Sequence, residues 1–385
     1  MRWIELTHRW LGGTIGLLLA AIGLSGAILV HRDAWTMVPH KHDAVARSAD
    51  QVAMAVRDAL QDGAGRLETV TFAAPGFSVD RLEFAGGRGA YADQTGHVLV
   101  RWNSEWARPE LWLFDCHRHL FAGDAGETVV GLAGLAGILF IVTGSVLWWR
   151  TRRTFSFRLL PMRLSRPAIV RHHRDLGIVM APLLLLSFVT GTVLVFRPLS
   201  SVVLGPGAAA AITQAAQPPR ARSASLGQTL DWTVMLRAAR MRLPRADFRA
   251  LIMPRGQSGL ITLRMKQPWE WLPNGRTTIW FAADTGRVVA VRDAGRLPAQ
   301  VRAYNILFPL HAGAVGGLAY RIVMTLPGLA LVLLGSLAVW TFWGPRKKAE
   351  KINTSTRGGR LASGERFSMA EGVRGATEIQ SDRQR

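Results

Sequence analysis

Histidines are the residues of this 385-residue sequence whose type and spacing suggest chemistry. Seven of the ten histidines lie at the ends of long apolar runs, where a polar ring is costly to keep without a partner or a function. Because consecutive membrane-spanning runs alternate in direction, these seven fall into two layers. One membrane face carries His8, His172 and His173, and the opposite face carries His31, His117, His119 and His311.

Each layer contains what a haem between helices requires: two imidazoles for opposite sides of the iron, apolar walls, and cations near the propionates. The inner layer offers His8 and His173 with the neighbouring Arg9 and Arg174, and the outer layer offers His117 and His311. This pattern predicts two irons that form an electron path across the bilayer. Zinc is disfavoured, because acidic residues and thiols are scarce near the pairs. The competing interpretation is that these are interfacial histidines among snorkelling arginines and belt tryptophans.

Four apolar runs are long enough to cross a hydrocarbon core of about 30 Å as helices. They occupy residues 10–30, 129–149, 176–196 and 322–343. Hydrophobic residues make up 49% of the chain and charged residues only 19%, which favours a membrane protein over two soluble domains. The single cysteine excludes an internal disulfide framework and a cysteine-rich metal site.

The net charge of +21 is concentrated beside the apolar runs. Residues 150–171 contain seven arginines and no acidic residue, and Arg346, Lys347, Lys348 and Lys351 follow the fourth run. Positive residues accumulate in cytoplasmic loops, so both termini are predicted to be cytoplasmic. A basic protein could bind nucleic acid, but the positions of these charges are already accounted for by membrane topology. No nucleic-acid partner is therefore predicted, and the expected partner is membrane lipid.

The first and third runs share one pattern at an offset of 165 residues. His8 matches His173, Arg9 matches Arg174, and Gly26 matches Gly191. The outer segments share the turns at residues 95–96 and 285–286, and the LFDCH segment at 113–117 before the second run resembles LFPLH at 307–311 before the fourth. We interpret the chain as two parallel repeats of helix, outer domain and helix. Such repeats pair around an axis along the membrane normal, with functional sites at their interface.

The predicted fold is therefore an α-helical integral membrane protein with four transmembrane helices, each repeat carrying a small α+β periplasmic domain. The predicted segments are a cytoplasmic lead and helix 1 (1–32), outer domain 1 (33–127), helix 2 (128–150), a basic cytoplasmic loop (151–171), helix 3 (172–197), outer domain 2 (198–320), helix 4 (321–344) and a disordered cytoplasmic tail (345–385). Helices are expected near 48–60 and 230–241, and strands near 67–72, 81–84, 98–102, 248–253, 260–265, 278–281 and 288–291.

The HRWLG and HRDLG openings, the LFDCH and LFPLH segments, the Leu147-Trp148-Trp149 ending and the Thr-Gly turns together resemble the PepSY-associated transmembrane helix family. Within that family, four helices with two PepSY-like outer domains are similar to the bacterial inner-membrane ferric-siderophore reductases of the ferrioxamine type. The resemblance covers the chain from residue 3 to about residue 348.

This resemblance implies two b-type haems and reduction of siderophore-bound Fe(III) to Fe(II) in the periplasm. It implies a hydroxamate siderophore as the substrate, and a quinone or a cytosolic donor as the source of electrons. Carried over by position, the iron ligands are His8, His173, His117 and His311, with Arg9 and Arg174 beside the inner pair. Alternative ligands are His119, His172 and His31, whose repeat counterpart is Phe196.

Two other functions fit parts of the sequence. A membrane-anchored binding or regulatory protein would use the PepSY-like domains without redox activity and would contain no chromophore. A transporter of the chelate itself is disfavoured, because four helices make a small pathway and no acidic residue lies inside a spanning run. The candidates for a siderophore docking surface are Trp102, Trp106, Trp112, Trp269, Trp271 and Trp280.

Overall fold

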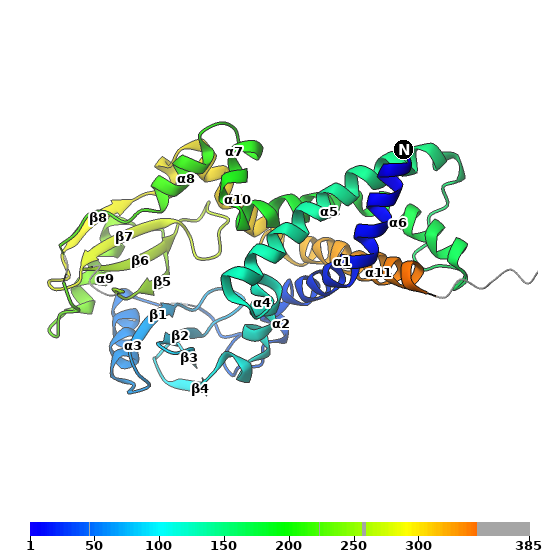
Figure 1. Cartoon of the computed structure of the whole chain (residues 1–385). Coiled ribbons are helices and arrows are strands. Elements are labelled where there is room, and N and C mark those ends of the chain that lie inside the picture. The colour runs from blue at the N-terminus through cyan, green and yellow to red at the C-terminus, as the bar shows by residue number, and fades with distance from the viewer. Residues whose placement is uncertain (46, 223, 256–258, 345–385) are drawn as a thin grey trace, which may run out of the picture. The chain divides into compact units, whose positions relative to one another are not determined.

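The computed structural model describes residues 1–344 except 46, 223 and 256–258, and Figure 1 shows the order of its elements along the chain. The predicted tail at 345–385, with Arg346, Lys347, Lys348 and Lys351, lies outside the described residues.

Four helices in the described part of the chain are long and apolar enough to cross a membrane. They are α1 (Arg2–Leu29), α5 (Gly123–Thr151), α6 (Arg166–Val195) and α11 (Gly317–Trp343). Each contains 27 to 30 residues, which span about 40–45 Å at 1.5 Å per residue. The four apolar runs are thus confirmed as helices. Because α1 and α6 begin before their runs, His8 and His173 lie inside these helices rather than ahead of them.

Small residues let the spanning helices approach closely, as is usual where lipid supplies no hydrophobic driving force. Helices α1 and α11 pack on each other through glycines: a Cβ at Gly16 would lie 2.8 Å from the carbonyl oxygen of Gly335, and one at Gly23 would lie 2.9 Å from that of Gly328. Helices α5 and α6 also pack together, where a Cβ at Gly137 would lie 2.5 Å from the Phe188 ring.

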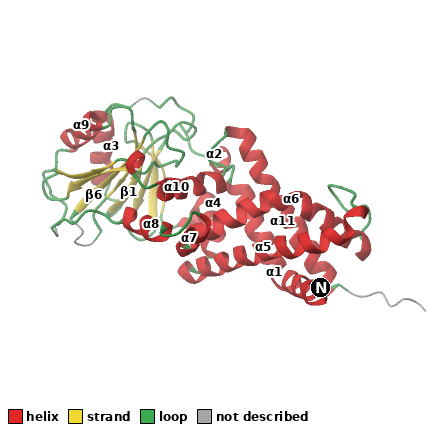
Figure 2. Cartoon of the chain, turned by 90° about the horizontal axis from the view of Figure 1, so that it is seen from above, coloured by secondary structure: helices red, strands yellow, loops and turns green. Residues whose placement is uncertain are grey.

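Eight strands form one antiparallel sheet in the order β4-β3-β2-β1-β5-β6-β7-β8. The first four are β1 (Leu67–Thr71), β2 (Asp80–Phe84), β3 (Arg88–Ala92) and β4 (Val98–Trp102), and the others are β5 (Asp247–Ile252), β6 (Leu260–Lys266), β7 (Thr277–Ala282) and β8 (Val288–Arg292). Strand β1 pairs with β5, placing Val70 opposite Leu251, both fully buried. The strands of the two outer segments therefore join in a single sheet (Figure 2).

Helices α3 (Ala49–Gln61) and α9 (Trp232–Arg242) share the sheet's main hydrophobic core. Ser48 and Gln51 form a capping box at the start of α3, and the Asp231 side chain caps α9. Both helices and seven strands confirm the predicted elements to within about two residues. Strand β3 was not predicted, because its sequence RGAYA combines Gly and Ala, which are depleted in strands.

Short helices precede two of the spanning helices, and the sequence did not predict them. They are α4 (Pro109–His119) before α5 and α10 (Ala299–His311) before α11. The other short elements are the helices α2 (Arg32–Trp35), α7 (Ser200–Val203) and α8 (Ala208–Ala216) and the 3-10 turns η1 (Glu105–Ala107), η2 (Arg152–Thr154), η3 (Arg197–Leu199) and η4 (Ala294–Arg296).

Buried contacts hold α4 and α10 in place. The Glu110 carboxylate of α4 is 3% exposed and accepts hydrogen bonds from the Tyr91 hydroxyl of β3 at 3.0 Å and from Arg108 Nε at 2.7 Å. Burial, reinforced by Glu110, raises the pKa of Tyr91 to about 12, so the hydroxyl remains a donor at neutral pH. In α10, Val301 packs on Ala208 and Ile212 of α8. Helices α4 and α10 are therefore anchored to the outer segments at their first turns.

Candidate functional site

The last turns of α4 and α10 bring two predicted site residues together. The imidazole rings of His117 and His311 have centroids 6.2 Å apart, with 42° between their planes. Both side chains are half-buried. They belong to different halves of the chain, so only the tertiary structure pairs them.

The His117 ring is oriented by the end of α1. Its Nδ1 lies 3.1 Å from the Ile22 carbonyl oxygen and 3.0 Å from Ser25 Oγ. A carbonyl oxygen only accepts hydrogen bonds, so Nδ1 carries the proton and Nε2 has the free lone pair. The ring also lies against Gly26, where a Cβ would be 2.9 Å from Cε1 of His117.

The His311 ring is oriented in the same way by α6. Its Nδ1 lies 3.2 Å from the Ser187 carbonyl oxygen and 3.1 Å from Thr190 Oγ1, which again leaves Nε2 free. A Cβ at Gly191 would be 2.9 Å from Cε1 of His311. Each of these three α6 positions lies 165 residues after its α1 counterpart, so the two halves of the chain hold their histidines by the same contacts.

The inner pair, His8 of α1 and His173 of α6, has ring centroids 6.1 Å apart and perpendicular ring planes at 90°. The Nδ1 of His8 lies 2.8 Å from Thr143 Oγ1, and that hydroxyl donates its proton to the Leu139 carbonyl oxygen at 2.7 Å. The hydroxyl therefore accepts from His8 Nδ1, and Nε2 of His8 is free. The Nδ1 of His173 is buried, and no side chain of the described residues hydrogen bonds to it.

The two pairs occupy different depths of the bundle. Along α1, the inner ligand candidate His8 and the outer contact Ser25 are 17 residues apart, which corresponds to about 25 Å of helix rise. This is most of the thickness of a hydrocarbon core of about 30 Å. The pairs therefore form two layers of the helix bundle, separated by nearly a membrane thickness.

The ring spacing in each pair suits one metal ion between the imidazoles. Two rings that ligate one ion through Nε2 have centroids about 6 Å apart, because each metal–nitrogen bond is about 2.0 Å and each centroid lies about 1 Å behind its nitrogen. A ligating histidine commonly donates its other ring N–H to a carbonyl or similar group, as His117, His311 and His8 do. Within the described ranges no cluster of three or more His, Cys, Asp or Glu could hold a metal by itself. Two imidazoles supply two ligands, so a metal held by either pair would take its remaining ligands from another source.

A family model for the PepSY-associated TM region matches residues 6–344. The chain belongs to this family. No curated protein matches the chain. In this member of the PepSY-associated TM family, the matched region contains both histidine pairs and every residue that hydrogen bonds to them.

The other predicted site residues of this PepSY-associated TM protein have different partners. His31 Nε2 lies 2.9 Å from Thr325 Oγ1 of α11, His119 Nδ1 lies 2.7 Å from Asp115, and His172 Nε2 donates to the Leu159 carbonyl oxygen at 3.1 Å. Arg174 pairs with Asp175, with 2.7 Å between Nε and Oδ1, and Arg9 is exposed. The structure thus brings together four of the candidate histidines and leaves the three alternates outside the pairs.

Sequence reasoning matched Gly26 with Gly191 but missed that these glycines and the hydroxyl residues before them orient the rings. Ser25-Gly26 and Thr190-Gly191 occupy equivalent positions in the two halves of the chain, and Thr143-Gly144 contacts His8. A hydroxyl residue followed by glycine, recurring at the same offset as the histidines, is the sequence signal that would have identified them.

Proposed function

We propose that this PepSY-associated TM protein is an inner-membrane reductase that binds two b-type haems, carries electrons across the bilayer and reduces siderophore-bound Fe(III) to Fe(II) in the periplasm. The observation that carries the proposal is the His117–His311 pair, whose 6.2 Å ring spacing and matching Nδ1 hydrogen bonds leave two free Nε2 atoms. The inner pair repeats this spacing in the other layer of the bundle. Haem held by each pair would supply a one-electron carrier near each membrane surface.

The residues around each pair set the tautomer and orientation of the ligands. The Ile22 and Ser187 carbonyl oxygens hold Nδ1–H of His117 and His311, which directs Nε2 away from the helix backbone. Gly26 and Gly191 let the rings lie against α1 and α6. In the inner layer, the Thr143 hydroxyl accepts a hydrogen bond from Nδ1 of His8 and so orients that ring.

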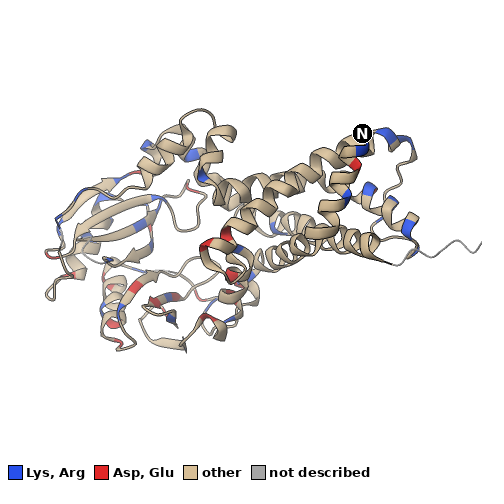
Figure 3. Cartoon of the chain, viewed as in Figure 1, with Lys and Arg blue, Asp and Glu red and all other residues tan. Residues whose placement is uncertain are grey.

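We propose that the chain consists of two parallel repeats. The matching contacts of His117 with α1 and of His311 with α6, at positions 165 residues apart, support this proposal. We also propose that both ends of the chain are cytoplasmic and both outer segments periplasmic. The arginines of the α5–α6 connection lie at the end of the bundle that also holds the N-terminus (Figure 3), and such residues concentrate on the cytoplasmic side.

The proposed substrate follows from the chemistry of iron. Hydroxamate and catecholate oxygens are hard donors, which bind Fe(III) more tightly than Fe(II), so adding one electron loosens the chelate. The electron donor is proposed to be a quinone or a cytosolic reductant, since no nucleotide-binding motif occurs in the sequence.

The test is a visible spectrum of the detergent-purified protein, oxidised and then reduced with dithionite, with haem quantified as the pyridine haemochrome. We expect low-spin b-type bands and about two haems per chain. His117→Ala and His311→Ala should each remove one haem and abolish reduction of a ferric siderophore, while leaving the protein in the membrane. His42→Ala, at an exposed loop position, is the control and should retain both haems.

A colourless protein from haem-replete cells would contradict the proposal and favour a membrane-anchored binding protein. Unchanged haem content in both His117→Ala and His311→Ala would contradict the assignment of the outer pair. The inner pair is tested separately by the same measurement on His8→Ala.

A further inference from the structure

The outer-segment tryptophans differ in exposure, and Trp112 of α4 is half-buried. Trp102 and Trp280 are each 5% exposed and belong to the packed interior. Trp106, Trp269 and Trp271 are 60%, 53% and 50% exposed. Trp106 has a neighbour in Phe121, whose ring centroid lies 4.9 Å away. Trp269 and Trp271 are two residues apart in the connection between β6 and β7, where they expose two large apolar faces together.

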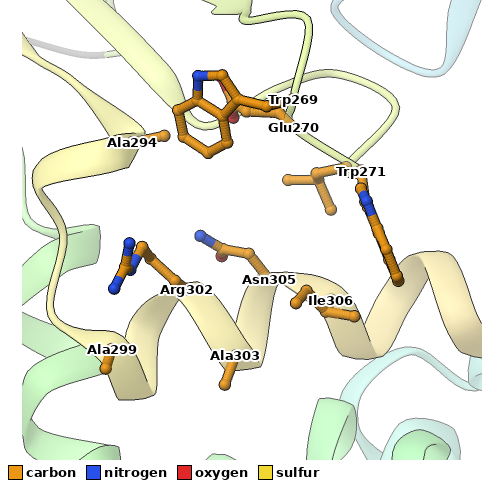
Figure 4. Close-up of a pocket in the computed structure, with 10 residues that line it drawn as sticks. Trp269, Glu270, Trp271, Ala294, Ala299, Arg302, Ala303, Asn305 and Ile306 are labelled. Carbon is orange, nitrogen blue, oxygen red and sulfur yellow. The ribbon is translucent and has the colours of Figure 1, made fainter.

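Trp269 and Trp271 line a cleft of about 410 Å³ between this connection and α10. Figure 4 shows Arg302, Asn305 and Ile306 projecting from α10 toward the loop that carries both indoles. Small-molecule sites typically have volumes of about 300–1,000 Å³ and combine apolar walls with a few polar groups. The cleft has this size and this composition.

Glu270 holds the tryptophan loop in shape through buried hydrogen bonds. It is 7% exposed, and its Oε1 accepts hydrogen bonds from the Gln267 backbone N–H at 2.9 Å and the Thr277 hydroxyl at 2.9 Å. Its Oε2 accepts from the Arg276 backbone N–H. The indoles are therefore presented by a preorganised loop, which lowers the entropic cost of binding.

Among the residues that line the cleft, Arg302 is the cation and Glu270 the acidic group. Arg302 is exposed, and no carboxylate in the described part of the chain forms an ion pair with it. The buried carboxylate of Glu270 is the acidic group lining the cleft, and its oxygens are already hydrogen bonded. The exposed charge in the cleft is therefore that of Arg302, with which an anionic group of a ligand would pair.

We propose that this cleft binds the ferric chelate and selects one with aromatic donor groups and net negative charge, of the catecholate class. Indole faces stack on aromatic rings, and the planar Arg302 guanidinium both pairs with negative charge and stacks on aromatic faces. A cationic trihydroxamate has neither feature. This inference rests on the proposed function and specifies the substrate class for it.

The position of the cleft suits electron transfer to a bound chelate. Ile306 lines the cleft and lies five residues before His311 on the same helix, α10. Five residues correspond to about 7.5 Å of helix rise. A ligand against α10 would thus lie close to the outer histidine pair.

The experiment measures binding without electron transfer. Gallium(III) complexes have the charge and shape of the Fe(III) complexes but are not reduced, so equilibrium dialysis with elemental detection of gallium reports binding alone. The probes are Ga(III) tris-catecholate, which is anionic and aromatic, Ga(III) citrate, which is anionic and not aromatic, and a cationic Ga(III) trihydroxamate. We expect the tris-catecholate to bind at least tenfold more tightly than the trihydroxamate.

Variants assign this preference to the cleft. Trp269→Ala combined with Trp271→Ala should weaken tris-catecholate binding at least tenfold and change citrate binding little. Arg302→Glu should weaken binding of both anions, and Arg302→Lys should restore part of it. Trp106→Ala, which removes an exposed indole elsewhere, should bind as the unmodified protein does. Near-UV circular dichroism and size-exclusion elution report whether each variant is folded.

Unchanged tris-catecholate affinity in the folded double tryptophan variant would overturn the inference and leave the indoles as membrane-interface residues. Tighter binding of the cationic trihydroxamate by the unmodified protein would overturn the charge preference. The outcome is separable from that of the proposed function: a haem-free protein that binds the gallium tris-catecholate contradicts the reductase and supports the cleft, and a haem-containing protein that does not bind it contradicts the cleft alone.

Discussion

At the scale of single residues, the inner and outer pairs differ in how their ligand candidates are held. His117 and His311 each have a carbonyl and a hydroxyl at Nδ1, whereas His8 has the Thr143 hydroxyl. No side chain of the described residues hydrogen bonds to Nδ1 of His173, and the backbone of Leu334 lies close enough to act on this ring. At the position of α11 that corresponds to Thr143 in α5, the chain has Leu334, which offers no hydroxyl. We infer that Thr143 is the main orienting group of the inner layer.

Thr143→Val tests this residue directly. The substitution keeps the side-chain shape but removes the acceptor for His8 Nδ1–H, and losing such a supporting hydrogen bond typically lowers metal affinity by about 10–100-fold. We expect haem titration into haem-depleted protein to show one site weakened by this factor and the other unchanged.

Thr14→Val is the matched control, because Thr14 is exposed on α1 and its hydroxyl bonds only to carbonyl oxygens of its own helix. Equal haem affinities for Thr143→Val and the unmodified protein would show that Thr143 does not support an inner ligand.

At the scale of elements, glycines serve two different contacts in the spanning helices. Gly16 and Gly23 of α1 face Gly335 and Gly328 of α11 and let the two backbones approach. Gly26, nearer the end of α1, faces the imidazole of His117 instead. The same helix therefore uses glycine for packing over most of its length and for ring placement at the outer layer.

Gly26→Ala and Gly191→Ala test the ring-placement role. Each new Cβ would lie 2.9 Å from an imidazole Cε1, too close for an ordinary contact, so the ring must move. Overpacking of this kind costs about 1–3 kcal/mol, equivalent to about 5–150-fold weaker binding at the outer site. The measurement is haem content after dialysis against a haem-binding competitor.

Gly177→Ala separates this contact from the effect of alanine on the helix itself. Gly177 lies in α6, and a Cβ added there would meet no neighbouring group of the described residues within 4 Å. Replacing this glycine by alanine nevertheless raises helix propensity by the same amount as at Gly26 and Gly191, about 1 kcal/mol. Equal haem retention in all three variants would show that Gly26 and Gly191 do not position the histidine rings.

At the scale of the whole molecule, the antiparallel sheet makes the outer segments one structural unit. The β1–β5 ladder runs through fully buried residues such as Val70 and Leu251, and the core beneath it takes side chains from both α3 and α9. The histidine pairs likewise take one ring from each half of the chain. Neither the sheet nor the paired sites would be complete in half of the chain.

Orientation in the membrane is tested on the intact chain with single cysteines. Leu164, in the α5–α6 connection, is 77% exposed, and Val202, in α7, is 80% exposed. In a Cys116→Ser background, we expect Val202→Cys to react with a membrane-impermeant maleimide in intact spheroplasts and Leu164→Cys to react only after lysis. Labelling in the reverse order would invert the proposed orientation and place the cleft in the cytoplasm.

The sequence by itself determined the four spanning helices, because apolar runs of this length can satisfy their backbone groups in lipid only as helices. It also determined the two histidine layers, since each layer follows from the alternation of the runs. The short helices α4 and α10 escaped prediction, because their positions depend on distant contacts such as Tyr91 with Glu110 and Val301 with Ile212.

Only the tertiary structure decided which histidines face each other. Within the outer layer, His31 and His117 are equally plausible from sequence, but His31 bonds to Thr325 while the end of α1 turns His117 toward His311. The joining of the strands into one sheet was also decided at this level, because β1 and β5 are far apart in the chain. Local patterns specify helices and strands, whereas pairing between distant segments depends on side-chain contacts that no local pattern encodes.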